Sequence, residues 1–439
     1  MFFLYSFLLT IAFLVLLPRF LFDAVRKEKY AAGFWQRLGF LPEFAKDEKA
    51  VLWIHCVSVG ETNAARPLVT ELKNSFPKFR LVVSTTTKTG QTLAREVFAG
   101  DADFIFYFPF DWQFAVRRVL RTIKPSAVLL METELWFNFL RETGASGAKV
   151  AIVNGRLSER SAVRYLYFKN FIRRGLNFVD LALMQGNEDA ERLIKLGIDP
   201  EKVKVTGNIK FDQKIDPGED ALSRELRKQF GVSKDAPVIV AASTHAPEEK
   251  WILQAFANVR QNVRENSPRL LLAPRHPERF DEVSKLCRET SFNVARRSQK
   301  MSEQDSLAEI MLLDSIGELR AAYHLAEIVF VGGSLIPHGG QSFLEPALAR
   351  KAIVTGFYTT NFARATQEFV EQNALVQMPQ LNENEIVDKL AETFLNLLRE
   401  PETREKLAEN AFAVMKKNRG AAAKTVEMLK PLLQTSDKK

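Results

Sequence analysis

The chain of 439 residues carries 61 lysines and arginines against 53 aspartates and glutamates, which gives a formal net charge of +8. Its 46% hydrophobic and 26% charged residues are typical of a globular protein and exclude a disordered chain, and its length suits two domains. The two cysteines, Cys56 and Cys287, lack the spacing of a metal site or a disulfide framework and favour a reducing compartment. The basic residues are scattered without a nucleic-acid-binding signature, so we expect no nucleic-acid partner.

The first segment, residues 2–18, reads FFLYSFLLTIAFLVLLP and is almost wholly apolar and uncharged. Its length is at the short end for a membrane span and also suits a helix lying partly in one leaflet. Neither the basic leading region nor the small-residue cleavage site of a signal peptide is present. Positive charge follows at Arg26, Lys27 and Lys29, which by the positive-inside bias places the rest of the chain in the cytoplasm. We therefore predict an uncleaved membrane anchor over residues 1–22.

Beyond this segment, apolar β-rich runs alternate with helical stretches along the whole chain. The predicted strands are 51–59, 80–87, 104–108, 127–133, 149–155, 181–185 and 203–207 in the first half, and 237–243, 269–274, 292–297, 310–315, 327–333, 352–356 and 374–378 in the second. Continuous apolar runs separated by helices indicate parallel sheets that are covered on both faces. The sequence thus predicts an α/β protein with two doubly wound domains, residues 23–209 and 221–439, joined by a polar linker at 210–220.

Polar residues follow many of the predicted strands, and ligands of doubly wound sheets bind at the carboxyl ends of strands. In the second half these residues are Ser243-Thr244-His245, residues 275–279 and the segment 332–346. In the first half they are residues 58–61, 85–90, 109–111, 132–134 and 154–156. Three strand ends with phosphate-compatible chemistry in one domain predict a binding site there.

The segment 332–346, GGSLIPHGGQSFLEP, is the most informative of these. Its four glycines allow positive φ and a close approach of the backbone to a ligand. Pro346 is tolerated only in the first turn of a helix, so a helix begins near it, and the exposed N–H groups there would attract an anion such as phosphate. Glu345 is suited to accept hydrogen bonds from a pair of sugar hydroxyls. The alternative is a plain turn with a capping box of Ser342 and Glu345, which the position of Pro346 disfavours.

Eight stretches carry a resemblance to a known family. They are WIHCVSVGE (53–61), STTTKTG (84–90), METELW (131–136), VNGRLSERS (153–161), GNIKFD (207–212), STHAPEE (243–249), APRHPERF (273–280) and the segment 332–346. Together they resemble the membrane-associated 3-deoxy-D-manno-oct-2-ulosonic acid (Kdo) transferases of lipopolysaccharide synthesis. The resemblance implies the GT-B architecture of two Rossmann-like domains, a CMP-Kdo donor and a phosphorylated lipid A precursor (lipid IVA) as acceptor. It also implies inverting transfer at the inner membrane, without a bound metal or other cofactor.

The resemblance further implies roles for particular residues. On the donor side these are Arg275, His276, Pro277, Gly339, Gly340, Ser342 and Glu345, with Ser243, Thr244 and Lys210 as weaker candidates. On the acceptor side they are Ser58, Gly60, Glu61, Arg156, Arg26, Lys27 and Lys29. Arg275 and Glu134 are also candidates for catalysis. Residues 156–174, rich in arginine and aromatic side chains, suit either a helix resting on anionic lipid or an ordinary solvated helix.

The position of the catalytic base departs from what the resemblance implies. A family member is expected to carry a glutamate in an ERLG-like stretch soon after the anchor, where this chain has Gln36 in GFWQRLGF. An amide has no useful proton affinity, so Gln36 cannot take the proton of the acceptor hydroxyl. Three explanations compete: an engineered substitution, which we favour at this point, an inactive homologue, or the use of another carboxylate, with Glu61, Glu132 and Glu134 as candidates.

Alternatives to this assignment differ in chemistry. Asp101-Ala102-Asp103 matches the Asp-x-Asp pattern of metal-dependent transferases, but it precedes a predicted strand, so we interpret it as a turn. Another GT-B enzyme, such as a nucleotide-sugar epimerase or a lipid A disaccharide synthase, is the nearest rival activity. A non-catalytic, membrane-bound protein that binds nucleotide sugar or lipid is the rival from another class, and only Gln36 supports it.

Overall fold

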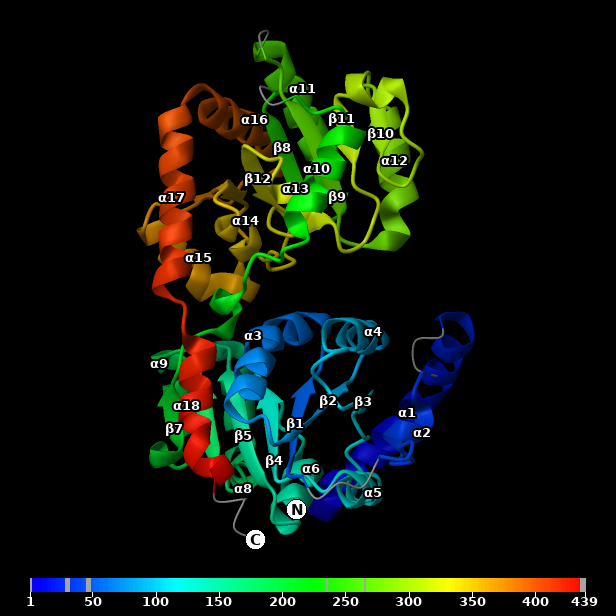
Figure 1. Cartoon of the computed structure of the whole chain (residues 1–439), viewed down its shortest axis with the longest axis vertical. Coiled ribbons are helices and arrows are strands. Elements are labelled where there is room, and N and C mark those ends of the chain that lie inside the picture. Colours follow the sequence, from blue (N-terminus) through cyan, green and yellow to red (C-terminus); the bar gives the residue numbers. More distant parts are fainter. Residues whose placement is uncertain (1, 28–31, 45–48, 234–235, 264–265, 435–439) are drawn as a thin grey trace. The chain divides into compact units, whose positions relative to one another are not determined.

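The computed structural model describes residues 2–27, 32–44, 49–233, 236–263 and 266–434. The chain forms two compact units, of which unit 1 comprises Met1–Gln213 and Asn418–Lys439 and unit 2 comprises Lys214–Lys417 (Figure 1). Each unit contains one sheet of seven parallel strands. The predicted α/β class with two parallel sheets is confirmed.

The sheet of unit 1 has the strand order β3-β2-β1-β4-β5-β6-β7. Its strands are β1 (Val51–Cys56), β2 (Arg80–Thr85), β3 (Phe104–Tyr107), β4 (Ala127–Met131), β5 (Lys149–Gly155), β6 (Leu181–Met184) and β7 (Val203–Val205). Its helices are α1 (Phe2–Lys27), α2 (Phe34–Arg37), α3 (Val59–Ser75), α4 (Lys88–Val97), α5 (Gln113–Ile123), α6 (Phe137–Ala145), α7 (Glu159–Leu166), α8 (Lys169–Leu176), α9 (Asn187–Lys195) and α18 (Ala421–Gln434), with the 3-10 turns η1 (Pro200–Lys202) and η2 (Ile209–Asp212). Because β1 pairs with β2 on one side and with β4 on the other, the strand order reverses between β1 and β4. Doubly wound sheets bind ligands at such a reversal point.

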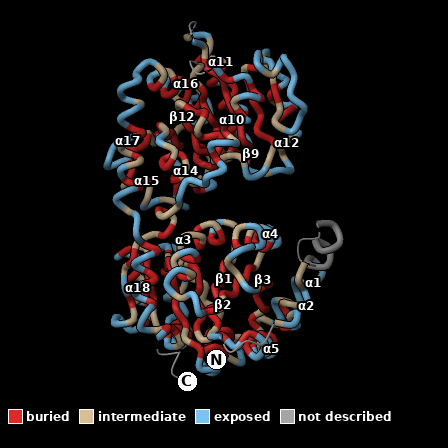
Figure 2. The backbone as a smooth tube through the Cα atoms, viewed as in Figure 1, coloured by how far each residue is buried: buried red, intermediate tan, exposed pale blue. Residues whose placement is uncertain are grey.

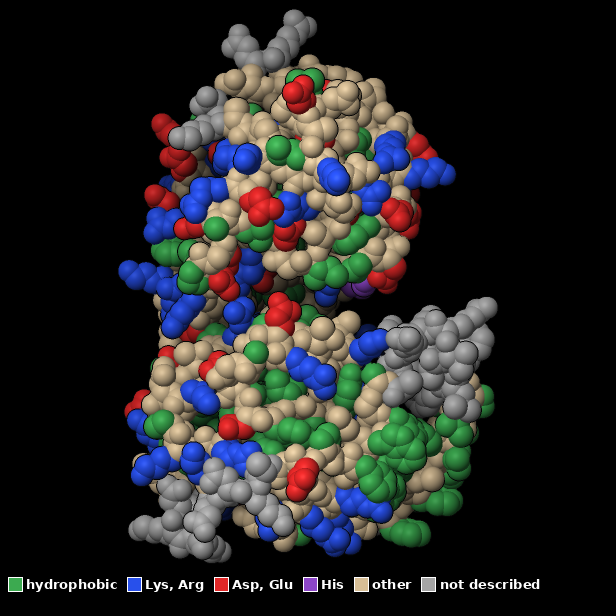
Figure 3. Space-filling model, turned by 45° about the vertical axis from the view of Figure 1, so that its right-hand side comes forward, with side chains coloured by type: hydrophobic (Ala, Val, Ile, Leu, Met, Phe, Trp, Pro, Cys, Tyr) green, Lys and Arg blue, Asp and Glu red, His purple; other side chains and the backbone are tan. Residues whose placement is uncertain are grey.

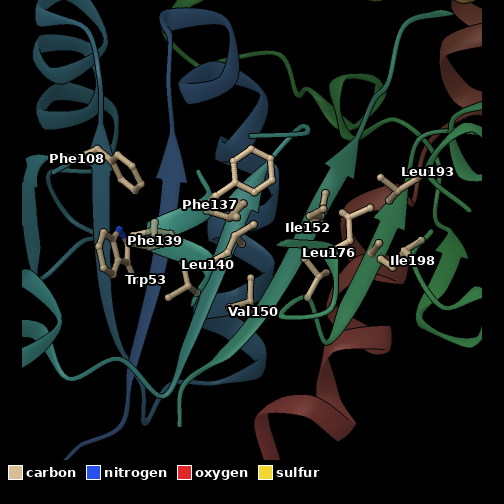
Figure 4. Close-up of a cluster of buried hydrophobic side chains, with 14 of the residues drawn as sticks. Trp53, Phe108, Phe137, Phe139, Leu140, Val150, Ile152, Leu176, Leu193 and Ile198 are labelled. Atoms are coloured by element: carbon tan, nitrogen blue, oxygen red, sulfur yellow. The ribbon is translucent and has the colours of Figure 1, made fainter. Parts of the chain in front are cut away.

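Every residue of β1 is buried, because helices cover both faces of the sheet (Figure 2). Successive side chains of a strand point to opposite faces, so Trp53 lies in one core and its neighbours Leu52 and Ile54 in the other. The Trp53 ring meets Phe139 of α6 edge-on, with ring centroids 5.0 Å apart, and Figure 4 shows this cluster. The unbroken apolar runs in the sequence therefore reflect strands buried on both faces.

The C-terminal helix differs from the prediction. The sequence assigned it to the second domain, but α18 belongs to unit 1, where Val426 and Leu429 join the core that α3 builds over the sheet. The carboxylate of Asp212 accepts hydrogen bonds from the N–H groups of Gly420 and Ala422, each at 2.5 Å, at the start of this helix. The amphipathic pattern revealed a helix, but it could not reveal which sheet buries the apolar face.

The sheet of unit 2 has the order β10-β11-β9-β8-β12-β13-β14. Its strands are β8 (Val238–Thr244), β9 (Arg269–Pro274), β10 (Val294–Arg296), β11 (Ile310–Leu312), β12 (Ile328–Val331), β13 (Ala352–Thr355) and β14 (Val376–Gln377). Its helices are α10 (Glu219–Gln229), α11 (Glu248–Asn262), α12 (Phe280–Arg288), α13 (Leu319–Tyr323), α14 (Leu344–Leu348), α15 (Ala363–Glu371), α16 (Glu383–Arg399) and α17 (Pro401–Lys417), with the 3-10 turns η3 (Pro277–Arg279), η4 (Glu303–Leu307) and η5 (Thr360–Phe362). Here β8 pairs with β9 and β12, so the order reverses between β8 and β12.

The apolar N-terminal segment forms helix α1, which is part of unit 1 and packs against its helix α6. The Tyr5 hydroxyl donates to the Asp111 carboxylate at 2.8 Å, and the Asn138 amide donates to the Ser6 hydroxyl at 2.9 Å. Within the described part of the chain, no helix is both long and apolar enough to cross a membrane. The predicted helix is confirmed. A membrane-spanning anchor is not supported, and one side of α1 packs against the rest of unit 1.

Candidate functional site

The carboxyl end of β1 carries Ser58 and Glu61, two predicted site residues. The Ser58 hydroxyl caps α3 by accepting a hydrogen bond from the Glu61 N–H at 3.4 Å. The Glu61 carboxylate accepts from the Val57 N–H at 2.7 Å and from the Ser58 hydroxyl at 3.2 Å. Burial, followed by the nearby charge of Glu132, raises the pKa of Glu61 to about 8. A carboxyl group with this pKa can exchange a proton near neutral pH.

Two further carboxylates follow β4, on the other side of the reversal point. Glu132 has a φ of 57°, which is unusual for a residue with a side chain, and its carboxylate forms an ion pair with Lys210 at 2.8 Å. Burial, followed by the charge of Glu132, raises the pKa of Glu134. Lys210 was predicted on the donor side, yet it lies in unit 1 among these acidic side chains. Strained backbone at a strand end is a feature of functional sites.

Gln36 lies at the edge of the same sheet. Helix α2 places its side-chain oxygen 3.0 Å from the N–H of Tyr107 in the edge strand β3, and this N–H donates to it. The next residue, Arg37, donates from its guanidinium to the Thr86 carbonyl at 2.5 Å. Gln36 therefore satisfies a backbone donor of an edge strand, a structural role that an amide oxygen performs as well as a carboxylate oxygen.

The remaining predicted acceptor residues have different surroundings. Gly60 is exposed in the first turn of α3, where a Cβ would meet only the Ser58 hydroxyl within 4 Å, at 3.8 Å. The N–H of Arg156 donates to the Thr133 hydroxyl at 3.1 Å and so joins the ends of β5 and β4. The side chains of Arg26 and Lys27, and the whole of Lys29, lie outside the described residues.

The Asp-x-Asp motif has a structural role. The Asp103 carboxylate accepts a hydrogen bond from the Leu81 N–H at 2.7 Å and holds the turn that leads into β3. The interpretation of this motif as a turn is confirmed. Among the described residues, no group of three His, Cys, Asp or Glu side chains could hold a metal ion.

In unit 2, a single carboxylate joins the ends of β8 and β12. Glu248, the first residue of α11, is fully buried. Its two oxygens accept hydrogen bonds from the N–H groups of His245 at 3.0 Å, Gly333 at 2.7 Å, Ser334 at 3.0 Å and Leu335 at 2.9 Å. Four N–H donors on one carboxyl group match the acceptor capacity of an ionised carboxylate. Sequence reasoning missed this residue, although an acid in the first helical turn after a strand end was a usable signal.

The predicted donor residues after β8 and β9 lie beside this carboxylate. Ser243 has a φ of 54°, and the pairing of β8 with β9 shifts register there. The Arg275 N–H donates to the Thr244 carbonyl at 3.0 Å, while its exposed guanidinium makes no hydrogen bond or ion pair with the described residues and is suited to phosphate. His276 and Pro277 follow at the surface. The Thr244 side chain is fully buried and so points into the protein.

The glycine segment partly corrects the prediction. Pro346 lies in the first turn of α14 as expected, but α14 has only five residues, too few for a strong helix dipole. The N–H of Gly340 donates to the Gly333 carbonyl at 2.7 Å, so the loop itself already uses this donor. Gly339 has a φ of 97°, and a Cβ there would lie 2.7 Å from the Asn361 side-chain nitrogen, so only glycine fits. Since neither the short helix nor the Gly340 N–H offers a strong site for phosphate, side chains near the loop are better candidates for binding it.

Ser342 and Glu345 do not form the capping box that was the alternative. The Ser342 hydroxyl accepts from the Leu344 N–H at 3.4 Å, and no side chain caps α14. Burial raises the pKa of Glu345, and the opposing charge of Arg320 is the next influence on it. Arg320 lies 2.8 Å from the Glu219 carboxylate, so Glu345 belongs to a charged network inside unit 2.

Comparisons with known proteins agree with this arrangement. Residues 32–213 match the family model of the 3-deoxy-D-manno-octulosonic-acid transferases. A 3-deoxy-D-manno-octulosonic acid transferase of Haemophilus influenzae is 34% identical over 412 residues, which cover 94% of each chain. The solved C-terminal CMP-Kdo binding domain of WaaA from Acinetobacter baumannii is 33% identical and covers 45% of this chain and 98% of that one, with a TM-score of 0.40. A putative UDP-N-acetylglucosamine 2-epimerase of Listeria monocytogenes shares the fold at 15% identity and a TM-score of 0.58, over 89% of this chain and 98% of that one. The chain therefore belongs to the Kdo transferase family.

Proposed function

We propose that this Kdo transferase moves Kdo from CMP-Kdo onto lipid IVA or a similar phosphorylated lipid A precursor, with inversion and without a metal. The observation that carries the proposal is the acidic cluster of Glu61, Glu132 and Glu134 at the reversal point of unit 1. Unit 2 supports it with the opposite chemistry at its own strand ends, where the exposed Arg275 follows β9 and the glycine-rich loop follows β12. The first set suits a hydroxyl acceptor, and the second suits a departing phosphate.

Inverting transfer needs a base, and we assign this role to Glu61. The acceptor oxygen attacks the anomeric carbon of Kdo while the bond from that carbon to the phosphate oxygen breaks. The electron pair of the broken bond leaves with CMP, and the hydroxyl proton passes to the Glu61 carboxylate. Glu132 is less suited, because it is paired with Lys210. Of the three explanations for Gln36, the use of another carboxylate is now the favoured one.

A product assay tests the proposed reaction. With CMP-Kdo and a tetraacylated, bisphosphorylated lipid A precursor, the purified protein is expected to yield products heavier by whole Kdo units in mass spectrometry, with or without a chelator. Loss of the reaction in the chelator would contradict metal-free transfer. Transfer from a UDP-sugar instead would point to a disaccharide synthase. Binding of CMP without any transfer would favour the non-catalytic alternative.

We also propose that unit 1 rests on the membrane through α1 and its neighbours. The outward side of α1 exposes Phe3 (85%), Phe7 (54%), Leu14 (58%) and Val15 (71%), and Trp35 of α2 is also exposed (66%). Figure 3 shows hydrophobic side chains gathered on the part of unit 1 that carries this helix. A helix with one apolar side in solvent suits an interface between lipid and water, and exposed apolar surface of this extent is uncommon in a monomer.

Helices α7 and α8 extend the same chemistry. Tyr167 is 80% exposed and Phe168 is 68% exposed, and both lie between helices rich in arginine. The ring of Phe171 in α8 lies 5.8 Å from that of Phe2 in α1, so the two regions are neighbours. Aromatic side chains flanked by arginines suit anionic lipid headgroups. With this surface on the cytoplasmic side of the inner membrane, the lipid acceptor would be within reach of unit 1.

A charge-insertion variant tests the membrane surface. The double variant Phe3→Glu, Val15→Glu is expected to lower partitioning onto vesicles of anionic phospholipid by more than about tenfold, because each buried apolar side chain contributes roughly 1.5–3 kcal/mol. Co-sedimentation with the vesicles measures the effect. The matched control is Leu307→Glu, Ile316→Glu in unit 2, at residues that are 71% and 79% exposed. Equal losses in both variants would contradict the proposal.

A further inference from the structure

Three histidines meet at the carboxyl edge of the unit 2 sheet. His245 follows β8, His276 follows β9, and His338 lies in the loop after β12. The ring centroid of His245 is 4.2 Å from that of His338 and 5.2 Å from that of His276. The sequence showed all three residues, but it did not show that three separate strand ends bring the rings together.

Hydrogen bonds fix the backbone of His338 in its loop. The His338 N–H donates to the Ile336 carbonyl at 2.6 Å, and the Asn361 amide donates to the His338 carbonyl at 3.2 Å. Gly333 lies between the two nearer rings: a Cβ there would be 3.4 Å from atoms of both His245 and His338. The loop after β12 therefore brings His338, whose side chain is exposed, onto the buried His245, while His276 adds a partly exposed ring from the end of β9.

His245 has an unused nitrogen. Its Nδ1 lies 3.1 Å from the Ser243 carbonyl, and a carbonyl only accepts, so Nδ1 carries the hydrogen. Nε2 then holds the lone pair of a neutral imidazole. This atom is buried and has no hydrogen-bond partner among the described residues, and the side chain is only 7% exposed. A buried polar atom without a partner calls for an explanation, and an anionic ligand oxygen is one that fits the basic surroundings of this ring.

The side chains that influence His245 are mostly basic ones. Burial, followed by His338 and His276, lowers the pKa of His245 to about 4; Arg275 lowers it further, while the Ser243 carbonyl opposes the shift. The nearest carboxylate, that of Glu248, already accepts four backbone N–H groups. The Glu278 carboxylate lies 3.9 Å from His276 at the exposed rim. A basic cluster in which Glu248 is already engaged and Glu278 lies at the exposed rim can accommodate an anion beside His245.

We propose that His245, supported by His276 and His338, binds the nucleotide phosphate through Nε2 and takes up a proton when the phosphate binds. The proposal rests on the donor site proposed above for unit 2 and adds both a binding residue and a proton. An anion near the rings favours the charged imidazole, and such a neighbour raises a histidine pKa by about 1–3 units. Since the bound form holds the extra proton, affinity for the nucleotide should rise as the pH falls.

The titration of His245 tests this directly. The chain has five histidines, so NMR of the full-length protein labelled at histidine Cε1 gives few signals. The signal that is absent in the variant His245→Gln is that of His245. Saturation with CMP is expected to raise the titration midpoint of His245 by about 1–3 pH units, and saturation with uncharged cytidine is expected to leave it unchanged. CMP that binds without moving this midpoint would overturn the inference and leave the donor assignment intact.

Affinity measurements provide a second, independent readout. Relative to the wild type, His245→Gln is expected to lose up to about tenfold of its CMP affinity near pH 6, the value for a rise of about 3 units from a pKa of about 4, and much less near pH 8. The phosphate of CMP has a second pKa of about 6, so its own ionisation also changes the affinity with pH. This effect is the same for the wild type and the variant, and it cancels in the ratio of their affinities. The control Lys389→Gln alters a partly exposed residue of α16 that pairs with Glu392, and it should behave as the wild type. If His245→Gln lost CMP affinity equally at both pH values, the role of His245 would be structural only, which would overturn the inference. If the protein bound UDP but not CMP, the donor assignment would be overturned as well.

Discussion

Replacing Glu61 with glutamine is expected to lower the turnover number for Kdo transfer by about two to four orders of magnitude, the usual contribution of a general base. The amide keeps the shape of the side chain and still accepts from the Val57 N–H, so the cap of α3 should survive. The matched variant is Gln36→Glu, which adds a carboxylate at the edge strand. Because the Gln36 side chain accepts a hydrogen bond from a backbone N–H there, we expect the turnover number of the Gln36→Glu variant to stay within a few-fold of the wild type.

The pH profile sharpens this test. A base works only when ionised, and the pKa of Glu61 is raised to about 8, so the rate should climb as the pH rises toward that value and level off above it. The residual rate of the Glu61→Gln variant should not show this rise with pH. A Gln36→Glu variant that gains two to four orders of magnitude would instead place the base at residue 36 and revive the explanation of an engineered or inactive chain.

Replacing Glu248 with glutamine is expected to destabilise unit 2 by about 2–6 kcal/mol and to abolish measurable CMP binding, since two buried N–H groups would lose their acceptor at roughly 1–3 kcal/mol each. The glutamine offers one acceptor oxygen, and its NH2 group would face donors at Ser334 and Leu335 or at His245 and Gly333. Urea unfolding and CMP titration of the folded protein measure the two effects.

The neighbouring variant Glu249→Gln is the control for this loss. Glu249 is as buried as Glu248, but its carboxylate pairs with Arg279 at 2.6 Å instead of with the loop. The Glu249→Gln variant should be less stable than the wild type, but its folded molecules should bind CMP with nearly unchanged affinity. If both variants bind CMP alike, Glu248 does not organise the donor edge.

Much of the fold could be read from the chain, because parallel strands buried on both faces leave unbroken apolar runs. The strand ends also marked where polar chemistry would lie, and Ser58, Glu61 and Arg275 are found there. The spanning role predicted for residues 2–18 is not supported, since hydropathy does not report that Tyr5 and Ser6 bond to unit 1.

Composition, strand pattern and motif order determined the α/β class, the two sheets and the family, because these depend on local periodicity and on residues in chain order. Tertiary structure alone decided which residues act together. It gave α18 to unit 1 and paired Lys210 with Glu132. It buried Glu61 beside Glu132, and this burial, followed by the charge of Glu132, raises the pKa of Glu61 to about 8. It also brought His338 onto His245. Burial and charge proximity depend on packing between distant segments, and no local pattern in a sequence records them.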